Sequence, residues 1–245
     1  MINRRKCFKV YKDCAYVKRL RNLIIIGTSH IAKESVEEVK KVIHDQKPSI
    51  VALELDKRRL DSLLHPTKRR LRLQDIKKVG FKGFLFNLLG AWAEKKMGKM
   101  VSTPPGSEMK QAIASAQEVQ AKIALIDQDI HITLKRLSDT LTLREKGRFI
   151  KEVIMGVIGK REEVKLDLRK VPEQALIKKL TLRIKKEYPS LYKVLIEERN
   201  EVMAKALYKI MNQEKEGKII AVIGAGHEED IIDVIKKMEK DGAVF

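Results

Sequence analysis

Apolar residues follow two rhythms along this chain, one typical of buried strands and one typical of amphipathic helices. Short runs at residues 15–20, 23–26, 50–55, 124–126 and 219–223 predict strands. Helical three- and four-residue spacing begins at Ser35, extends from Ser107 to Ile123, and resumes from Pro189 to Ile210; Ser107 is the expected helix cap. This alternation predicts an α/β fold with a mixed, largely parallel sheet.

The pattern favours a single domain over residues 1–245, because this length is sufficient for one large hydrophobic core. Between residues 130 and 190 it is mostly helical and very basic, which predicts a helical insertion. From Gly242 to Phe245 the chain turns apolar after a helix expected to end near Lys240. We therefore expect the natural protein to continue beyond Phe245.

The chain is strongly basic, with 52 Lys and Arg residues against 33 Asp and Glu residues and a net charge of +19. Such a charge attracts an anionic membrane surface, acidic peptides or nucleic acid, of which we do not favour nucleic acid. We find no signal peptide, no run of 18 apolar residues, and no CxxC spacing between Cys7 and Cys14. We expect a membrane-associated protein whose soluble domain lies in the cytoplasm.

One apolar stripe is rich in aromatic residues. It extends from Phe81 to Trp92 and is followed by Lys95, Lys96 and Lys99. Helical spacing of this kind is typical of a core helix or a homodimer interface. The core or dimer interpretation is the more usual one, but the lysines are also compatible with docking on an anionic membrane surface, so that interpretation stays open.

Two GxxH motifs follow two of the predicted strands, one from Gly27 to His30 and one from Gly224 to His227. With 13 Gly and 5 His residues, chance alone would give about 0.3 such matches. A pair of them, each between a strand and a helix, indicates a duplicated strand–GxxH–helix unit. Two imidazoles and a carboxylate form a suitable site for zinc, manganese or cobalt. The alternative is that each histidine only caps its helix.

Glu54 lies in an otherwise apolar segment, and a buried carboxylate is costly without a compensating partner. It is therefore a candidate metal ligand or a candidate base for a metal-bound water. Alternatively, the strand is at the sheet edge and Glu54 faces solvent. Glu198 and Arg199 interrupt the apolar face of the helix after Pro189. Arg199 could stabilise an oxyanion, or the two could form a buried structural pair.

Six ordered segments closely resemble the TraB family, which is related to the Tiki, GumN and erythromycin esterase-like proteins. They are IIGTSH with Gly27 and His30, ALELDKRR with Glu54 and Arg59, PPGSEMKQAIASA with Glu108, IDQDIHITLKR with Asp127, Asp129, Thr133 and Arg136, EERNEVMA with Glu198 and Arg199, and VIGAGH with Gly224 and His227. In one departure, Gln128 stands where the family usually has an arginine after the aspartate.

The resemblance implies a duplicated α/β core with a site of two GxxH histidines, one glutamate and one arginine. His30, His227 and Glu54 would bind a divalent zinc, manganese or cobalt ion. Catalysis would involve Glu54, Arg199 and Arg136. The matched residues expected to contact the substrate are Gly27, Gly224, Arg59, Glu108 and Glu198.

Tiki relatives look like metal-dependent proteases, the esterase relatives hydrolyse a lactone, and bacterial TraB relatives are implicated in shutting down peptide pheromones. The resemblance thus implies a metal-dependent hydrolase, most simply a peptidase acting on a peptide or protein, with membrane segments beyond Phe245. One alternative is a non-catalytic module that sequesters a peptide, possibly as a homodimer. Another is a basic protein that binds a membrane surface or nucleic acid.

Overall fold

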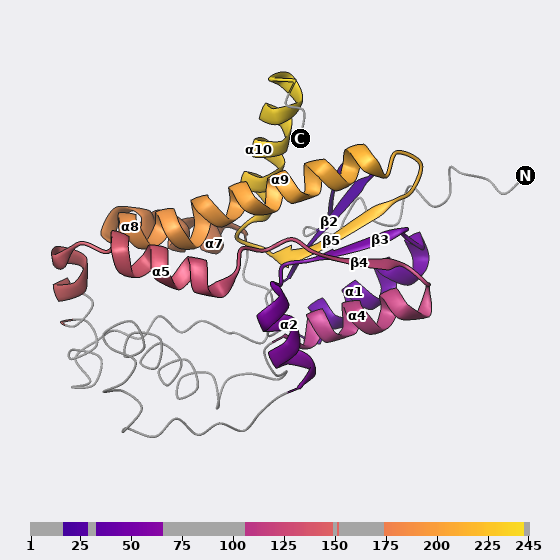
Figure 1. Ribbon diagram of the computed structural model, residues 1–245, viewed down its shortest axis with the longest axis horizontal. Coiled ribbons are helices and arrows are strands. Elements are labelled where there is room, and N and C mark those ends of the chain that lie inside the picture. Colours follow the sequence, from indigo (N-terminus) through magenta and orange to yellow (C-terminus); the bar gives the residue numbers. More distant parts are fainter. Residues whose placement is uncertain (1–16, 29–32, 66–105, 149–150, 152–173, 243–245) are drawn as a thin grey trace, which may run out of the picture.

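The computed structural model describes residues 17–28, 33–65, 106–148, 151 and 174–242, which form one sheet with helices on both faces (Figure 1). The strands are β1 (Val17–Leu20), β2 (Leu23–Thr28), β3 (Ile50–Leu53), β4 (Lys122–Leu125) and β5 (Ile219–Gly224). Their order is β1-β2-β5-β3-β4; β1 is antiparallel to β2 and the other pairs are parallel. The predicted α/β fold with a mixed, largely parallel sheet is confirmed.

Alternate residues of the inner strands pack against different helix layers, because successive side chains point to opposite faces of a sheet. Ile24 and Val222 pack with α1 and α4, whereas Ile25 and Ile223 pack with α9 and α10. The helices are α1 (Lys33–Gln46), α2 (Lys57–Leu64), α4 (Ser107–Glu118), α5 (Ile130–Thr140), α7 (Gln174–Glu187), α8 (Pro189–Tyr192), α9 (Glu198–Gln213) and α10 (Glu228–Lys240), with a π-helix at Lys193–Glu197. Within the predicted insertion, the structure describes α5, α7 and α8.

The two strands that precede the GxxH motifs are neighbours. β2 pairs in parallel with β5, and Thr28 is in register with Gly224. The carboxyl ends of β2, β5, β3 and β4 therefore meet at one edge of the sheet. Ligands of parallel α/β sheets bind at this edge, so the topology makes it the first place to look for a site.

Several predicted boundaries were wrong. The strand expected to reach residue 55 ends at Leu53, so Glu54 follows the strand instead of lying within it. The helix expected to include Ile123 ends at Glu118, and Ile123 belongs to β4. Its cap is Gly106, not Ser107; Gly106 has a φ of 83°, which glycine adopts without a steric cost. A π-helix also interrupts the late helix that was predicted to be continuous.

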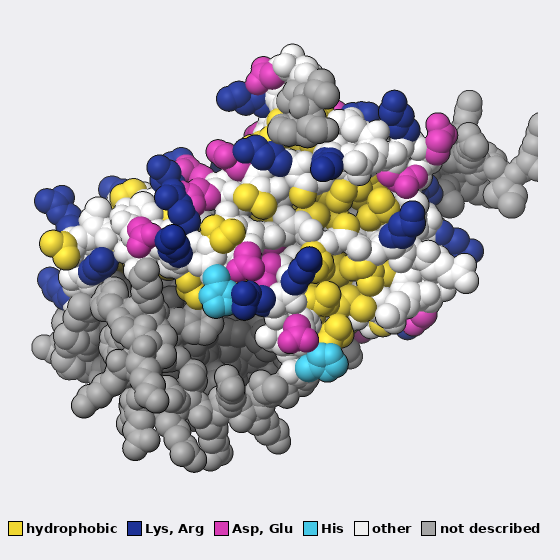
Figure 2. Space-filling model, in the orientation of Figure 1, with side chains coloured by type: hydrophobic (Ala, Val, Ile, Leu, Met, Phe, Trp, Pro, Cys, Tyr) yellow, Lys and Arg dark blue, Asp and Glu magenta, His cyan; other side chains and the backbone are white. Residues whose placement is uncertain are grey.

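Two surface features were predicted from the sequence, a strongly basic charge and an aromatic stripe. On the described part of the face shown in Figure 2, Lys and Arg side chains are interspersed with Asp and Glu side chains. The stripe from Phe81 to Trp92 lies outside the described residues. None of the described helices combines the length and apolar character needed to cross a membrane.

Candidate functional site

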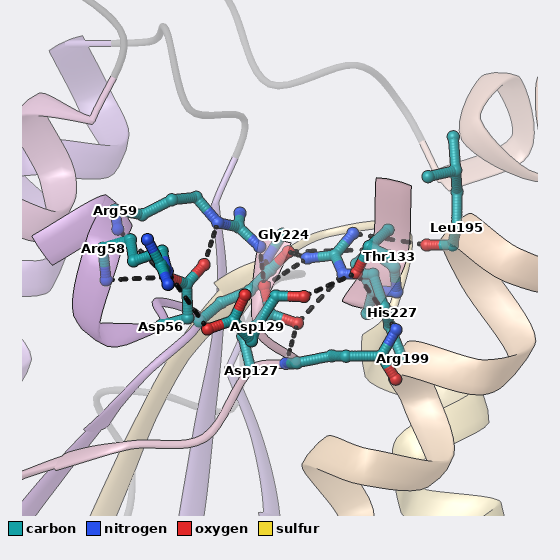
Figure 3. A network of polar contacts seen from close by, with 12 residues as sticks. Asp56, Arg58, Arg59, Asp127, Asp129, Thr133, Leu195, Arg199, Gly224 and His227 are labelled. Carbon is teal, nitrogen blue, oxygen red and sulfur yellow. Dashed lines mark hydrogen bonds and ion pairs between the residues drawn. The ribbon is translucent and has the colours of Figure 1, made fainter. Parts of the chain in front are cut away.

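A polar cluster lies where β3, β4 and β5 end (Figure 3). Glu54 follows β3, Asp127 lies two residues after β4, and Gly224 is the last residue of β5. Arg199, near the start of α9, connects the carboxylates, and His227 lies at the start of α10. The sheet edge thus brings together side chains that are far apart in the sequence.

Glu54 is held by donors from two different elements. Its Oε2 accepts a hydrogen bond from the backbone N–H of Gly224 at 2.6 Å, and its Oε1 contacts Arg199 Nη2. The residue is only 5% exposed, and β3 lies between β5 and β4. The alternative of an edge strand with Glu54 in solvent is therefore wrong.

Arg199 forms a bidentate pair with Asp127. Its Nε donates to Oδ1 at 2.9 Å and its Nη2 donates to Oδ2 at 2.8 Å, while Nη1 donates to the carbonyl of Leu195 at 3.2 Å. Burial would lower the pKa of Arg199, but Asp127 and Glu54 outweigh burial and raise that pKa. Arg199 is thus a permanent cation that orients both carboxylates.

The predicted alternative of a buried pair between Glu198 and Arg199 was wrong. Glu198 instead binds Arg136 of α5, with Arg136 Nε 3.1 Å from Oε2 and Nη2 2.5 Å from Oε1. Arg136 is exposed and directed at Glu198, whereas Arg199 points to Glu54 and Asp127. The π-helix directly before Glu198 includes Leu195, whose carbonyl Arg199 binds. Helical irregularities of this kind are frequent at functional sites.

A second arginine completes the cluster. Arg59 contacts Asp127 through Nη2 and donates from Nε to Asp56 Oδ2 at 2.8 Å. Asp56 is the N-cap of α2 and accepts from the backbone N–H groups of Arg58 and Arg59 at 2.8 and 3.1 Å. Burial alone would raise the pKa of Asp56, but the Arg59 side chain and these backbone donors hold it below its usual value. Asp127 is therefore bound by two guanidinium groups.

His227 occupies the N-cap position of α10, but its side chain does not cap the helix. Its Nδ1 is 2.6 Å from Asn200 Oδ1, and Asn200 Nδ2 donates to Asp230 Oδ2 at 3.0 Å. The other ring nitrogen, Nε2, lies 3.7 Å from Glu54 Oε1. The helix-cap interpretation is thus wrong for His227. Its ring is directed at the carboxylate of Glu54.

The donor atoms of His227 and Glu54 fit a divalent metal ion. A tetrahedral zinc ion with bonds of about 2.1 Å separates its ligand atoms by about 3.4 Å, close to the 3.7 Å between Nε2 and Oε1. His30, the third predicted ligand, lies outside the described residues. Within the described residues, no group of three or more His, Cys, Asp or Glu side chains is arranged to bind a metal. A metal ion bound at this position would take His227 and Glu54 as two of its ligands and would need others from outside the described residues or from solvent.

Gly27, the first residue of the first GxxH motif, lies against Glu228, the residue that follows the second motif. A side chain at position 27 would require Glu228 to move, because a Cβ added to Gly27 would lie 1.6 Å from Glu228 Oε1. Glu228 is 1% exposed, and Lys18 Nζ is 3.7 Å from its Oε2. Burial raises the pKa of Glu228 to about 7, against the opposing effect of Lys18. The close approach gives a physical reason for glycine at position 27.

Two further positions singled out in the sequence are Glu108 and Gln128, and the backbone N–H of Gln128 donates to Asp127 Oδ1 at 2.7 Å. Glu108 is buried in the first turn of α4, a helix of the layer opposite α9 and α10. Gln128, at the position of the usual family arginine, donates from Nε2 to Thr133 Oγ1 at 3.0 Å. The charge of Asp127 is met by Arg59 and Arg199 instead.

Sequence reasoning missed the roles of Asp127, Asn200 and Asp230. Asp127 could have been found, because it follows a predicted apolar strand in the same way as Glu54. Asn200 had no comparable signal, since one polar residue beside Glu198 and Arg199 does not reveal which helix it faces. Its contact with His227 depends on how α9 packs against α10.

The described features define an α/β domain with a buried polar site at the carboxyl edge of a largely parallel sheet. The sequence profile of the TraB/PrgY/gumN family matches residues 17–244, and the chain belongs to this family. An uncharacterized protein of Methanocaldococcus jannaschii is 37% identical over 220 residues, 89% of this chain and 54% of that protein. TraB domain-containing proteins of Bos taurus and Homo sapiens are 24% and 23% identical over 188 residues, 72% of this chain and 49% of each. The chain thus spans about half the length of these curated relatives.

Proposed function

We propose that this domain is a metal-dependent hydrolase that acts on peptides at the carboxyl edge of its sheet. The observation that supports this proposal most is the approach of His227 Nε2 to within 3.7 Å of Glu54 Oε1. Each of these side chains is held by its own buried partners, Asn200 for His227 and Gly224 with Arg199 for Glu54. Sites that bind metals orient their ligands in this way.

The surroundings of Glu54 favour a metal ligand over a general base. Both of its oxygens accept hydrogen bonds, one of them from a guanidinium, and such oxygens are poor proton acceptors. A zinc, manganese or cobalt ion, when bound, would polarise a substrate carbonyl and activate a water. Glu54 and His227 would hold the ion, with His30 as the third proposed ligand.

Arg199 has the role of a support in this proposal. Its guanidinium makes four hydrogen bonds, to Asp127, Glu54 and the Leu195 carbonyl. It therefore fixes Glu54 in place and keeps the negative charge of the cluster compensated. This assignment replaces direct stabilisation of an oxyanion by Arg199. Arg136, which binds Glu198 at the surface, would act only through that residue.

Peptidase activity is tested with protein purified without chelator. Its metal content is measured by mass spectrometry, and a broad peptide library is then incubated with the zinc, manganese and cobalt forms. We expect cleavage, and we expect His227→Ala and Glu54→Gln to abolish it while the circular dichroism spectrum is retained. His131→Ala is the matched control, because His131 is exposed on α5 and should leave activity unchanged. Full activity in His227→Ala would reject the proposed site.

A second candidate function is peptide sequestration without turnover. Both carboxylate oxygens of Glu54 already accept hydrogen bonds, which disfavours Glu54 as the base that would activate a water. The same observation therefore favours binding of a peptide without its hydrolysis. Stoichiometric capture of intact peptides, with no cleavage by any metal form, would support sequestration over hydrolysis. Association with an anionic membrane surface, dimerisation through the region from Phe81 to Trp92, and cytoplasmic location stay predictions.

A further inference from the structure

Three side chains form a buried chain of hydrogen bonds behind the candidate metal ligand. His227 is the N-cap residue of α10, and Asp230 lies in the first turn of that helix. Asn200 reaches both from α9. The Nδ1–Oδ1 distance between His227 and Asn200 is 2.6 Å, and Asn200 Nδ2 is 3.0 Å from Asp230 Oδ2. Asn200 is 2% exposed, so water contributes little to orienting its amide.

The direction of each hydrogen bond follows from the chemistry of the last residue. An ionised carboxylate only accepts hydrogen bonds, so the amide NH₂ of Asn200 must face Asp230. The amide oxygen of Asn200 then faces His227, and an oxygen that accepts requires a proton on Nδ1. The neutral ring consequently has its lone pair on Nε2, the nitrogen directed at Glu54.

We infer that Asp230 and Asn200 are positioning residues that hold His227 in the tautomer with the proton on Nδ1. That tautomer presents Nε2 toward Glu54 as the metal-binding atom. The use of Nε2 rests on the proposed function, whereas the tautomer itself is a property of the metal-free protein. In a metal-binding histidine, the hydrogen bond made by the ring nitrogen that does not bind the metal sets the tautomer of the ring and its affinity for the ion.

The inference is tested by nitrogen NMR on the full 245-residue chain, labelled with ¹⁵N-histidine and kept metal-free with a chelator. Long-range proton–nitrogen correlations distinguish a protonated from an unprotonated ring nitrogen, and His227→Gln identifies the His227 signals. At about pH 8, where a histidine of ordinary pKa is neutral, we expect a protonated Nδ1 and an unprotonated Nε2. A wild-type ring protonated on Nε2 alone would overturn the inference, whatever the variants do.

Variants then distinguish an effect of the hydrogen-bonded chain Asp230–Asn200–His227, here called the relay, from an effect of side-chain packing alone. Asn200→Leu removes the acceptor, and Asp230→Asn removes the requirement that the amide NH₂ face position 230; both should shift His227 toward Nε2 protonation. The double variant Asn200→Asp with Asp230→Asn exchanges donor and acceptor, so it should restore protonation at Nδ1. Asp233→Asn is the matched control, because Asp233 is exposed one turn later on α10. If Asp230→Asn and the double variant both give the wild-type spectrum, the relay is rejected.

Metal affinity provides a second readout. By competition with a chromophoric chelator, Asn200→Leu should bind zinc about 10- to 100-fold more weakly than the wild type. A wild type that binds none of zinc, manganese and cobalt, with the expected tautomer intact, would reject the proposed function and leave the hydrogen-bonded chain from Asp230 to His227 standing. Zinc binding that is equal in the wild type and a folded Asn200→Leu variant would overturn the role assigned to Asn200.

Discussion

Arg199 joins Asp127 through two parallel hydrogen bonds, although the two residues are 72 positions apart in the sequence. The Asp127 side chain is 0% exposed and that of Arg199 is 12% exposed. Removing one member of a buried pair leaves an uncompensated charge, which typically costs about 3–5 kcal/mol. This pair is therefore the structural anchor from which Glu54 is oriented.

The first prediction concerns the geometry of that pair. Arg199→Lys retains the charge but loses the two-pronged contact, so we expect a loss of about 2–4 kcal/mol in the free energy of unfolding. Urea denaturation measures the change. Arg136→Lys is the matched control, because Arg136 makes a similar two-pronged contact with Glu198 at the surface, and its loss should matter much less. Equal effects of the two substitutions would contradict the anchoring role.

The second prediction concerns the contact between Gly27 and Glu228. Gly27→Ala forces a Cβ against the Glu228 side chain, and overpacking of this kind costs about 1–3 kcal/mol. Glu228→Ala removes the atoms that would clash, so the double variant should be more stable than the two single effects predict. Gly147→Ala serves as the control, because nothing lies within 4 Å of a Cβ added there. Strict additivity of Gly27→Ala and Glu228→Ala would show that the contact is absent.

The sequence was sufficient to predict that polar residues follow apolar strands at one edge of the sheet, but not which of these residues pair there. Apolar runs ending in Gly27, Glu54 and Gly224 predict parallel strands whose ends carry polar chemistry. The partner of Arg199 could not be predicted, because helical periodicity says that it faces the core without saying what it meets. Adjacency to Glu198 suggested the wrong partner, since neighbours on a helix point in different directions.

The third prediction concerns pH and Glu228. Its pKa is raised to about 7 in the folded protein, against 4.5 as the ordinary value, so the folded state favours the neutral carboxyl. The resulting stability is fully present below pH 4.5 and is lost as the pH rises through about 7. The charged groups acting on this carboxyl are Lys18 on β1, Glu229 on α10 and Glu38 on α1. Of these three groups, only Lys18 lowers the pKa of Glu228; Glu229 and Glu38 raise it.

Glu228→Gln isolates this effect. The variant stays neutral, so the stability difference between wild type and variant should change by up to about 3 kcal/mol between acid and alkaline pH, with the variant favoured at pH 8. Urea denaturation at about pH 5, 6.5 and 8 measures the difference. Other titrating groups are common to both proteins and cancel. Parallel pH profiles for the two proteins would show that Glu228 keeps an ordinary pKa.

The last prediction separates two roles of Asp56. Its Oδ1 caps α2 by accepting from two backbone N–H groups, and its Oδ2 accepts from Arg59, which in turn binds Asp127. Asp56→Asn retains an oxygen for the cap but removes the charge, which should cost about 1 kcal/mol. Asp56→Ala also removes the cap, which adds about 0.5–2 kcal/mol.

Thermal denaturation should therefore rank the proteins as wild type, Asp56→Asn and Asp56→Ala in order of falling stability. The side chain of Asp56 is 4% exposed, so water cannot readily replace the lost acceptor in the alanine variant. Asp129→Ala provides a comparison, because Asp129 caps α5 at a more exposed position, where water can take over the backbone N–H of His131. If Asp56→Asn is as damaging as Asp56→Ala, the charge held by Arg59 matters more than the cap, and α2 is positioned by its link to Asp127.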